Sequence, residues 1–410
     1  MSLKRVQNEI SKQLNEIRES GRAKGAEKVI TGIKQASGNY GPRYYLSGWG
    51  AKEFIRMNSN SYLGMSLREE LIAAEEATAR KYGVGPGAVR FISGTLQPHI
   101  DLEHRLAEFH NRPAAMLFSS AYVTSMGVIV PLTTPETVLI SDELNHNCII
   151  QAMRLARPAA KAIYRHNDMA DFGKQVKESV GKGRRALVVT DGIFSMRGDH
   201  APLKELVEIS EKYNDRFEEG IITLIDDSHG VGAFGETGRG TEEYTGAQVD
   251  IVVGTLGKAF VVNGGYVVSD GVIIDFLRET APMYIYSNPI TASEAAAALK
   301  AVEILDSSAG RDILKHLRRM TKKFEQGLIN LGYETIPGEH PVVPLMVRDT
   351  AMTSDLVAYL MENGVLATGL NFPVVPKGDE EIRFQVCADH TEADIDYVLG
   401  VLKSYREERL

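Results

Sequence analysis

The chain has 410 residues, 43% hydrophobic and 24% charged, which is typical of a globular protein with a large buried core. The net charge of −8 argues against nucleic acid or an anionic membrane as a partner, and no apolar run is long enough to span a bilayer. The only two cysteines, Cys148 and Cys387, predict no disulfide framework and no metal site, as expected for a cytoplasmic protein.

The first sixty residues are expected to form an N-terminal segment that packs with a smaller domain. Residues 1–38 have a charged amphipathic pattern, which predicts one or two helices rather than a signal peptide. Residues 39–60 are rich in glycine, tyrosine and asparagine and predict short strands joined by turns.

Six short apolar runs mark the middle of the chain, at residues 114–119, 137–142, 186–192, 221–227, 251–255 and 264–270. Because these runs are almost continuously hydrophobic, they predict strands buried on both faces of a sheet. Helical patterns separate most of them, which favours a mostly parallel sheet between helices. The last two runs are too close together for a helical crossover, so that pair is predicted to be antiparallel.

The pattern changes after about residue 300, where long helical stretches lead to a strand around 381–387. This part predicts a smaller α+β domain. We therefore expect an N-terminal segment at 1–60, a large domain at 61–295 and a small C-terminal domain at 296–410, with a helix from about residue 291 joining the two domains.

Polar side chains follow five of the predicted strands. Ligands of open parallel sheets bind beyond the carboxyl ends of the strands, so these side chains are expected to meet at one edge. Any one of them alone is readily explained as a strand end or a helix cap. The set combines a lysine, an Asp–His pair, a second histidine and a hydroxyl-rich helix start: Ser119, Ser120, His146, Asp191, Ser195, Asp226, Asp227, His229, Thr255 and Lys258.

Lys258 indicates what this edge could bind. It follows a buried strand and lies between Gly257 and Ala259, which are too small to cover it. A desolvated lysine can form a Schiff base with a carbonyl. A helix start such as that after residue 119 can bind phosphate, and a carboxylate such as that of Asp226 can pair with a protonated pyridine nitrogen. Aldehyde, phosphate and pyridinium together describe pyridoxal 5′-phosphate (PLP).

Several stretches resemble the α-oxoamine synthase family of fold-type-I PLP enzymes. The most specific are DDSHGVGAFGETGRG at 226–240 and GTLGKAF at 254–260. Others follow in family order over roughly residues 40–400, among them NSNSYLG at 58–64, SDELNHNCII at 141–150 and FPVVPKGDEEIRFQV at 372–386. The pattern is most similar to the glycine C-acetyltransferase branch. One departure is KAFVVNGGY at 258–266, which lacks glycines expected directly after the lysine.

The resemblance implies an aspartate aminotransferase-like α/β fold, with a mostly parallel seven-stranded sheet in the large domain and a smaller α+β domain. It also implies roles for five residues around PLP, of which Lys258, Asp226, His146 and His229 are catalytic. Lys258 would bind the cofactor and remove the Cα proton of the amino acid, while Asp226 would pair with the pyridine nitrogen. His146 would stack on the ring, and His229 and Ser195 would lie near the phenolic oxygen.

The resemblance further implies a phosphate site, a substrate site and a homodimer with active sites at the subunit interface. Arg383, with Asn60, would bind the substrate carboxylate, a task that suits a planar guanidinium. The implied reaction condenses glycine or alanine with an acyl-CoA thioester and releases free CoA. The implied phosphate ligands are Ala121 and Tyr122 through their amides, Thr255, and Ser287 of the neighbouring subunit.

Other functions remain open at this point. A fold-type-I aminotransferase would share the PLP apparatus, and 8-amino-7-oxononanoate synthase or serine palmitoyltransferase activity would share the reaction type. A nicotinamide oxidoreductase is disfavoured, because Pro86 and the glycine spacing at 235–240 do not fit a dinucleotide-binding motif. A non-catalytic partner subunit is disfavoured by the presence of Lys258.

Overall fold

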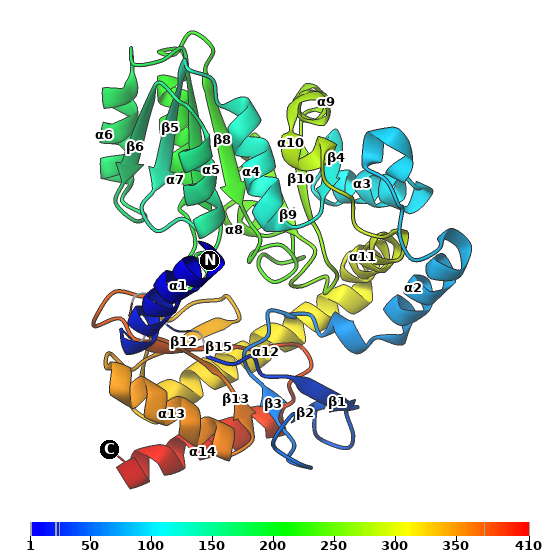
Figure 1. The fold of residues 1–410 in the computed structure, drawn as a ribbon, viewed down its shortest axis with the longest axis vertical. Helices are drawn as coiled ribbons and strands as arrows, with labels where there is room; N and C mark the ends of the chain where they lie inside the picture. The colour runs from blue at the N-terminus through cyan, green and yellow to red at the C-terminus, as the bar shows by residue number, and fades with distance from the viewer. Residues whose placement is uncertain (1, 21–22, 24, 373, 410) are drawn as a thin grey trace.

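The computed structural model describes residues 2–20, 23, 25–372 and 374–409. The described chain has two halves that meet along the long helix α12 (Ser308–Asn330) (Figure 1). No helix in these described ranges is long and apolar enough to cross a membrane.

A seven-stranded sheet forms the centre of the larger half, in the order β4-β10-β9-β8-β7-β5-β6. Neighbouring strands are parallel except β10, which is antiparallel to β4 and β9. Both the sheet and the antiparallel pair confirm the prediction. The strands are β4 (Ala114–Phe118), β5 (Thr137–Asp142), β6 (Ala160–Tyr164), β7 (Arg185–Asp191), β8 (Ile221–Asp226), β9 (Ile251–Thr255) and β10 (Gly265–Ser269).

Helices cover both faces of this sheet (Figure 1). The helices α4 (Ala121–Leu132), α5 (Asn147–Leu155), α9 (Gly271–Thr280) and α10 (Pro282–Ile285) share one apolar cluster with one face. The opposite face packs on α3 (Gln97–Phe109), α6 (Met169–Ser179), α7 (Leu203–Asn214) and α11 (Ala292–Leu305). The remaining elements of this half are α2 (Glu69–Tyr82), α8 (Thr241–Thr245), a 3-10 turn at Met65–Leu67 and a π-helical turn at Arg90–Gly94.

The smaller half contains an antiparallel four-stranded sheet in the order β11-β12-β15-β14. Its strands are β11 (Glu334–Thr335), β12 (Val342–Met346), β14 (Thr368–Leu370) and β15 (Glu381–Gln385). The helices of this half are α12, α13 (Thr350–Glu362) and α14 (Glu392–Arg409), which share an apolar cluster with β12 and β15.

The N-terminal segment corrects part of the prediction. Helix α1 (Ser2–Glu19) is present, but the residues described between it and position 38 contain no second helix; instead β1 (Ile30–Lys34) pairs with β2 (Arg43–Leu46). The short strands expected at 39–60 are confirmed by β2 and by β3 (Ile55–Arg56), which pairs with β13 (Val365–Leu366). Arg43 also donates to the buried carboxylate of Asp394 on α14 over 2.6 Å.

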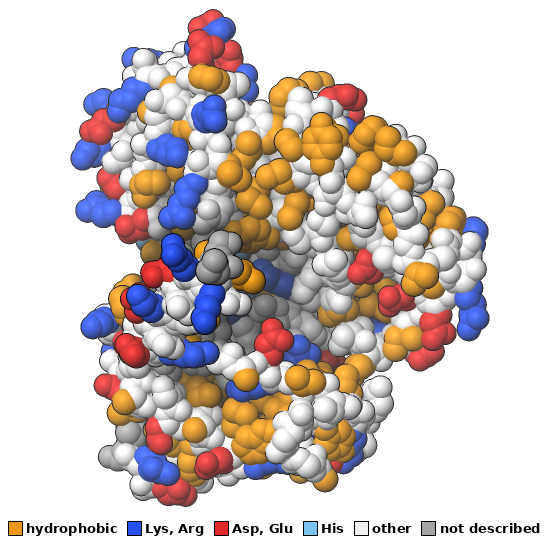
Figure 2. All heavy atoms as spheres, in the orientation of Figure 1, with side chains coloured by type: hydrophobic (Ala, Val, Ile, Leu, Met, Phe, Trp, Pro, Cys, Tyr) orange, Lys and Arg blue, Asp and Glu red, His pale blue; other side chains and the backbone are white. Residues whose placement is uncertain are grey.

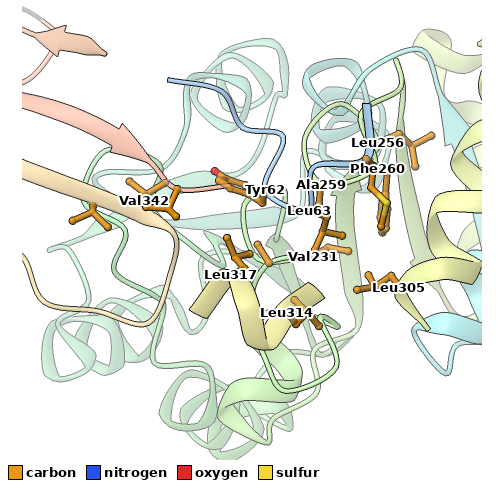
Figure 3. Packing of buried hydrophobic residues seen from close by; sticks show 14 of the residues in the cluster. Tyr62, Leu63, Val231, Leu256, Ala259, Phe260, Leu305, Leu314, Leu317 and Val342 are labelled. Carbon is orange, nitrogen blue, oxygen red and sulfur yellow. The ribbon is translucent and has the colours of Figure 1, made fainter. Parts of the chain in front are cut away.

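One apolar cluster joins the two halves at the lysine-bearing loop. Figure 3 shows Leu314 and Leu317 of α12 in the same cluster as Ala259, which directly follows Lys258. Val342 of β12 belongs to this cluster as well. The position of Lys258 is therefore fixed by packing from both halves, and not by its own strand alone.

Candidate active site

A cavity of about 260 Å³ lies at the carboxyl ends of five strands, β4, β5, β7, β8 and β9. Its lining includes eight of the eleven residues to which the resemblance assigned a role. These eight are Ala121, Tyr122, His146, Ser195, Asp226, His229, Thr255 and Lys258. Asn60, Arg383 and Ser287 are not part of this lining.

Lys258 lies in a tight loop after β9. The amide of Gly257 donates to the Thr255 hydroxyl over 3.1 Å, and the amide of Leu256 donates to the Gly264 carbonyl over 3.0 Å. Desolvation inside the protein lowers the pKa of Lys258 to about 8, although the nearby carboxylate of Asp226 opposes this effect. An appreciable fraction of this amine is therefore neutral near neutral pH, as a nucleophile that attacks an aldehyde must be.

The carboxylate of Asp226 is buried and held by three donors. Its Oδ2 accepts from the Ser125 hydroxyl over 2.8 Å and from the Cys148 thiol over 3.5 Å, and its Oδ1 accepts from the Ser228 amide over 3.1 Å. Hydrogen bonds to an ionised carboxylate stabilise the charge that a pyridinium nitrogen would need beside it. Ser125 and Cys148 were missed in the sequence, although both lie in the first two turns of helices that follow strands of the sheet.

His146 caps the start of α5 and is fixed at two points. Its backbone amide donates to the buried Asp191 carboxyl over 2.9 Å, and its Nδ1 lies 2.9 Å from the Cys148 sulfur. Burial lowers the pKa of His146, while Asp226 acts in the opposite direction. The lowered pKa favours the neutral imidazole, and the two contacts orient the ring on the wall of the cavity, where it can stack on a planar ligand.

A chain of hydrogen bonds connects β15 to the cavity. Arg383 donates to Asn60 Oδ1 over 3.1 Å, and the Tyr62 hydroxyl donates to the same oxygen over 3.3 Å. Tyr62 Oη is also 2.7 Å from His229 Nδ1, and His340 Nε2 is 2.7 Å from the His229 carbonyl oxygen. Burial, helped by the positive charges of Lys258 and Arg383, lowers the pKa of His229 well below its usual range.

This chain places Arg383 and Asn60 beside the site although they do not line the cavity. Tyr62 was not identified from the sequence, yet it lies in the quoted NSNSYLG stretch, two residues after Asn60. The available signal was a tyrosine, which can donate and accept hydrogen bonds, within a polar stretch expected near the active site.

Asp227 has a structural role. Its carboxylate accepts from the Thr241 amide over 2.7 Å and from the Thr241 hydroxyl over 2.6 Å. A Cβ atom on Gly192, Gly230 or Gly240 would lie 2.2, 2.1 or 1.9 Å from an oxygen of this carboxylate. These three glycines therefore let the backbone wrap closely around Asp227, which fixes the loop that carries His229.

The start of α4 offers an anion site at one end of the cavity. Ser120 caps the helix by accepting from the Val123 amide over 3.2 Å. The amides of Ala121 and Tyr122 precede the Val123 amide in the chain. As the first N–H groups of α4, they have no acceptor within the helix. A Cβ on Gly265 would lie 2.4 Å from the Ala121 nitrogen, so this glycine lets β10 pack directly against the helix start.

These residues fit PLP. The cavity combines an amine, a hydrogen-bonded carboxylate, an imidazole and a helix start, and the buried Ser228 hydroxyl on its wall has no partner in the described part of the chain. Ser287 follows α10 on a partly exposed segment outside the cavity, so its predicted contact with phosphate requires a second copy of the chain and stays a prediction. Among the described residues, no three histidine, cysteine or acidic side chains come together as a metal site.

Comparison with known proteins places this geometry in a family. The aminotransferase class I and II family matches residues 52–402. An 8-amino-7-oxononanoate synthase from Thermosipho melanesiensis is 37% identical over 391 residues, which cover 95% of each chain. A mitochondrial 2-amino-3-ketobutyrate coenzyme A ligase from Bos taurus is 36% identical over 398 residues, which cover 96% of this chain and 91% of the relative.

Solved structures agree with this placement. A serine palmitoyltransferase from Sphingomonas wittichii has a TM-score of 0.86 at 29% identity and covers 96% of this chain and 97% of its own. The chain therefore belongs to the aminotransferase class I and II family and has its fold-type-I architecture. Within that family it is an α-oxoamine synthase, a PLP-dependent acyltransferase.

Proposed function

We propose that this enzyme condenses glycine or L-alanine with a short acyl-CoA thioester, as a glycine C-acetyltransferase does, and releases an α-oxoamine and free CoA. The observation that carries the proposal is the meeting of Lys258, Asp226 and His146 in one cavity that Arg383 reaches through Asn60, Tyr62 and His229. This arrangement provides an amine, a carboxylate and a guanidinium for the three tasks of binding the cofactor, holding charge and binding an amino acid.

Each residue has a distinct task in this proposal. PLP, when bound, supplies the electron sink that makes the Cα proton of the amino acid removable. Lys258 accepts that proton, since its lowered pKa leaves the amine partly neutral. Asp226 holds the positive charge of the pyridine nitrogen, and Arg383 binds the substrate carboxylate as a bidentate donor.

A second candidate differs only in the acyl group. The Thermosipho melanesiensis relative carries the name 8-amino-7-oxononanoate synthase, and it is as similar to this chain as the Bos taurus ligase is. We prefer the shorter acyl group because the cavity that adjoins the site is small, at about 170 Å³. An aminotransferase would use the same PLP apparatus without any thioester, so dependence on acyl-CoA separates that alternative.

We further propose that the active enzyme is a homodimer. Figure 2 shows apolar side chains gathered over α9 and α10 on the visible face. Val272 and Phe276 lie one turn apart on α9 and are 77% and 44% exposed, and Tyr286 after α10 is 80% exposed. Because monomeric proteins rarely expose a large contiguous apolar patch, this surface favours a second subunit that brings its Ser287 to the phosphate.

The test is a visible absorption spectrum of the purified protein, followed by additions of glycine, L-alanine and L-serine. A yellow band that shifts with one amino acid, and free CoA released when acetyl-CoA is then added, are the expected results. Lys258→Ala should lose the lysine-linked band and the CoA release, whereas Lys300→Ala, which changes a half-exposed side chain on α11 paired with Glu303, should keep both. A colourless protein that PLP cannot reconstitute would overturn the mechanism.

A further inference from the structure

A second cavity of about 170 Å³ adjoins the active site between the two halves of the molecule. Ser195 lines both this cavity and the larger one that contains Lys258, so the two spaces meet at that residue. The second cavity lies between the segment around Phe194 in the large half and strands β12 and β15 in the small half. Its apolar lining includes Leu144, Phe194, Met196, Met346, Val374 and Val375.

One polar group faces this apolar space without a partner. Glu381 of β15 lines the cavity, is only 2% exposed, and its Oε1 has no hydrogen-bond partner in the described part of the chain. It lies two residues before Arg383, so both side chains project from the same face of the strand. A buried carboxyl oxygen without a partner costs free energy, which a ligand in the cavity would recover by supplying a hydrogen bond.

Glu381 is suited to neutral polar ligands. Burial raises the pKa of Glu381 to about 8, although the nearby guanidinium groups of Arg383 and Arg197 oppose the effect. Near neutral pH the side chain is therefore largely a neutral acid, which can donate one hydrogen bond and accept others.

The charged groups at this cavity do not favour a carboxylate. Arg197 donates to Asp199 over 3.3 Å, and Asp379 lies 3.5 Å from Arg348. The one cation that lines the cavity within the described residues is thus already paired, and a ligand carboxylate would meet the carboxylate of Asp379 without an unpaired cation in the lining to bind it.

We propose that this cavity receives the acyl group of the thioester, and that Glu381 selects short acyl groups with a neutral hydrogen-bonding group, such as a hydroxyl. The inference rests on the proposed function and specifies its substrate class. The size agrees with a short acyl group, since a protein cavity of ~150 Å³ holds a ligand as small as benzene. The amino acid is expected elsewhere, near Arg383, Asn60 and His229, so the space beyond Ser195 is left for the acyl chain.

The experiment compares three thioesters of equal chain length with one another as substrates. The PLP-loaded enzyme and glycine are present in every assay. Initial rates of free CoA release give kcat/KM for 3-hydroxybutanoyl-CoA, butanoyl-CoA and succinyl-CoA. We expect a preference of up to about tenfold for the hydroxyl compound over each of the others, since one hydrogen bond contributes up to about a factor of ten.

Variants of Glu381 locate the cause of that preference. Glu381→Leu should abolish the preference for the hydroxyl compound over butanoyl-CoA, whereas Glu381→Gln, which can still hydrogen-bond, should keep it within about threefold. Asp379→Asn is the matched control at the same cavity and should leave the ratio for these two thioesters unchanged. The wild-type comparison decides the question by itself if the leucine variant does not fold.

The outcomes separate this inference from the proposed function. Equal or better use of butanoyl-CoA or succinyl-CoA by the wild type would overturn the role of Glu381 while leaving the condensation intact. The role of Glu381 in acyl selection would also be overturned if Glu381→Leu changed the choice between L-serine and L-alanine but not the choice of acyl group. Absence of CoA release with every thioester, acetyl-CoA included, would overturn the proposed function and this inference with it.

Discussion

Val261, three residues after Lys258, has a left-handed backbone with φ of 58°. This conformation brings the Cβ of an L-residue close to its own backbone and costs roughly 1–2 kcal/mol, and it is least expected of a β-branched residue. The strain falls in the stretch where the sequence lacks an expected glycine. The side chain is partly buried against the cluster that joins the two halves, and this packing offsets some of the cost.

Substitutions at Val261 should reveal this strain. Glycine adopts positive φ freely, so Val261→Gly should have a free energy of unfolding about 1 kcal/mol higher than Val261→Ala, as measured by urea denaturation. At Val262, which is outside the left-handed region, the order should reverse, because glycine is then the more costly residue. The same order at both positions would contradict the left-handed conformation of Val261.

At the scale of single residues, the sequence located the chemical groups better than their partners. Lys258, Asp226 and His146 follow strands, and their convergence was predicted from sheet topology alone. Tyr62 and Cys148 were missed because their contacts with His229 and Asp226 depend on approaches between segments that are distant in the chain. Such approaches leave no local pattern in the sequence.

Among the elements, the segment after β6 connects two loops of the site. His166 Nδ1 lies 3.2 Å from Asp142 at the end of β5, and its Nε2 lies 3.0 Å from Asp199. Asp142 is four residues before His146, and Asp199 is four residues after Ser195. Burial lowers the pKa of His166, but the two carboxylates outweigh it and raise the pKa to about 9.

The raised pKa of His166 predicts a pH-dependent contribution to stability. A histidine whose folded pKa exceeds its usual value of about 6.5 stabilises the fold fully below that value, and the contribution disappears as the pH rises through about 9. His166→Gln should therefore lower the free energy of unfolding most near pH 6 and progressively less toward pH 9 and above.

Urea denaturation across this pH range checks the prediction. The control is His104→Gln on the exposed face of α3, which should change the free energy of unfolding little at any pH. A loss for His166→Gln that is equal at pH 6 and pH 10 would show that the imidazole does not act as a cation between the two loops.

Strands with a continuous apolar run were predicted well, and strands without such a run were not. The six apolar runs became β4, β5, β7, β8, β9 and β10, whereas β6, at the edge of the sheet, was not recognised from its residues. The side chains of β6 alternate in burial until its last residue, so it has no continuous apolar run. Strand β1 was predicted as helix because its few residues depend on pairing with β2.

For the whole molecule, the exposed patch on α9 leads to a prediction about assembly. Phe276→Asp would place a charge in the proposed subunit interface, where desolvation of the charge is costly. Sedimentation should show a dimer for the wild type and a shift toward monomer for this variant. Met352→Asp, an exposed position on α13 in the other half, is the control and should remain dimeric.

The same experiment tests the predicted role of Ser287. If the dimer dissociates, each subunit should also lose affinity for PLP, because the phosphate would lack its contact from the second subunit. A wild type that is monomeric at all concentrations would reject both the interface and the contribution of Ser287.

The sequence by itself determined the class of fold, the cofactor and the strand-end residues of this enzyme. Those features depend on local hydrophobic patterns and on a rule of sheet topology, and both can be read along the chain. Only the tertiary structure showed the link from Arg383 to His229 through Asn60 and Tyr62, the donors around Asp226, and the cavity that Glu381 faces. The link and the second cavity arise where the two halves meet, whereas the donors around Asp226 come from α4, α5 and the loop after β8 within the large half. In each case the geometry is set by packing between residues distant in the chain, up to hundreds of positions apart.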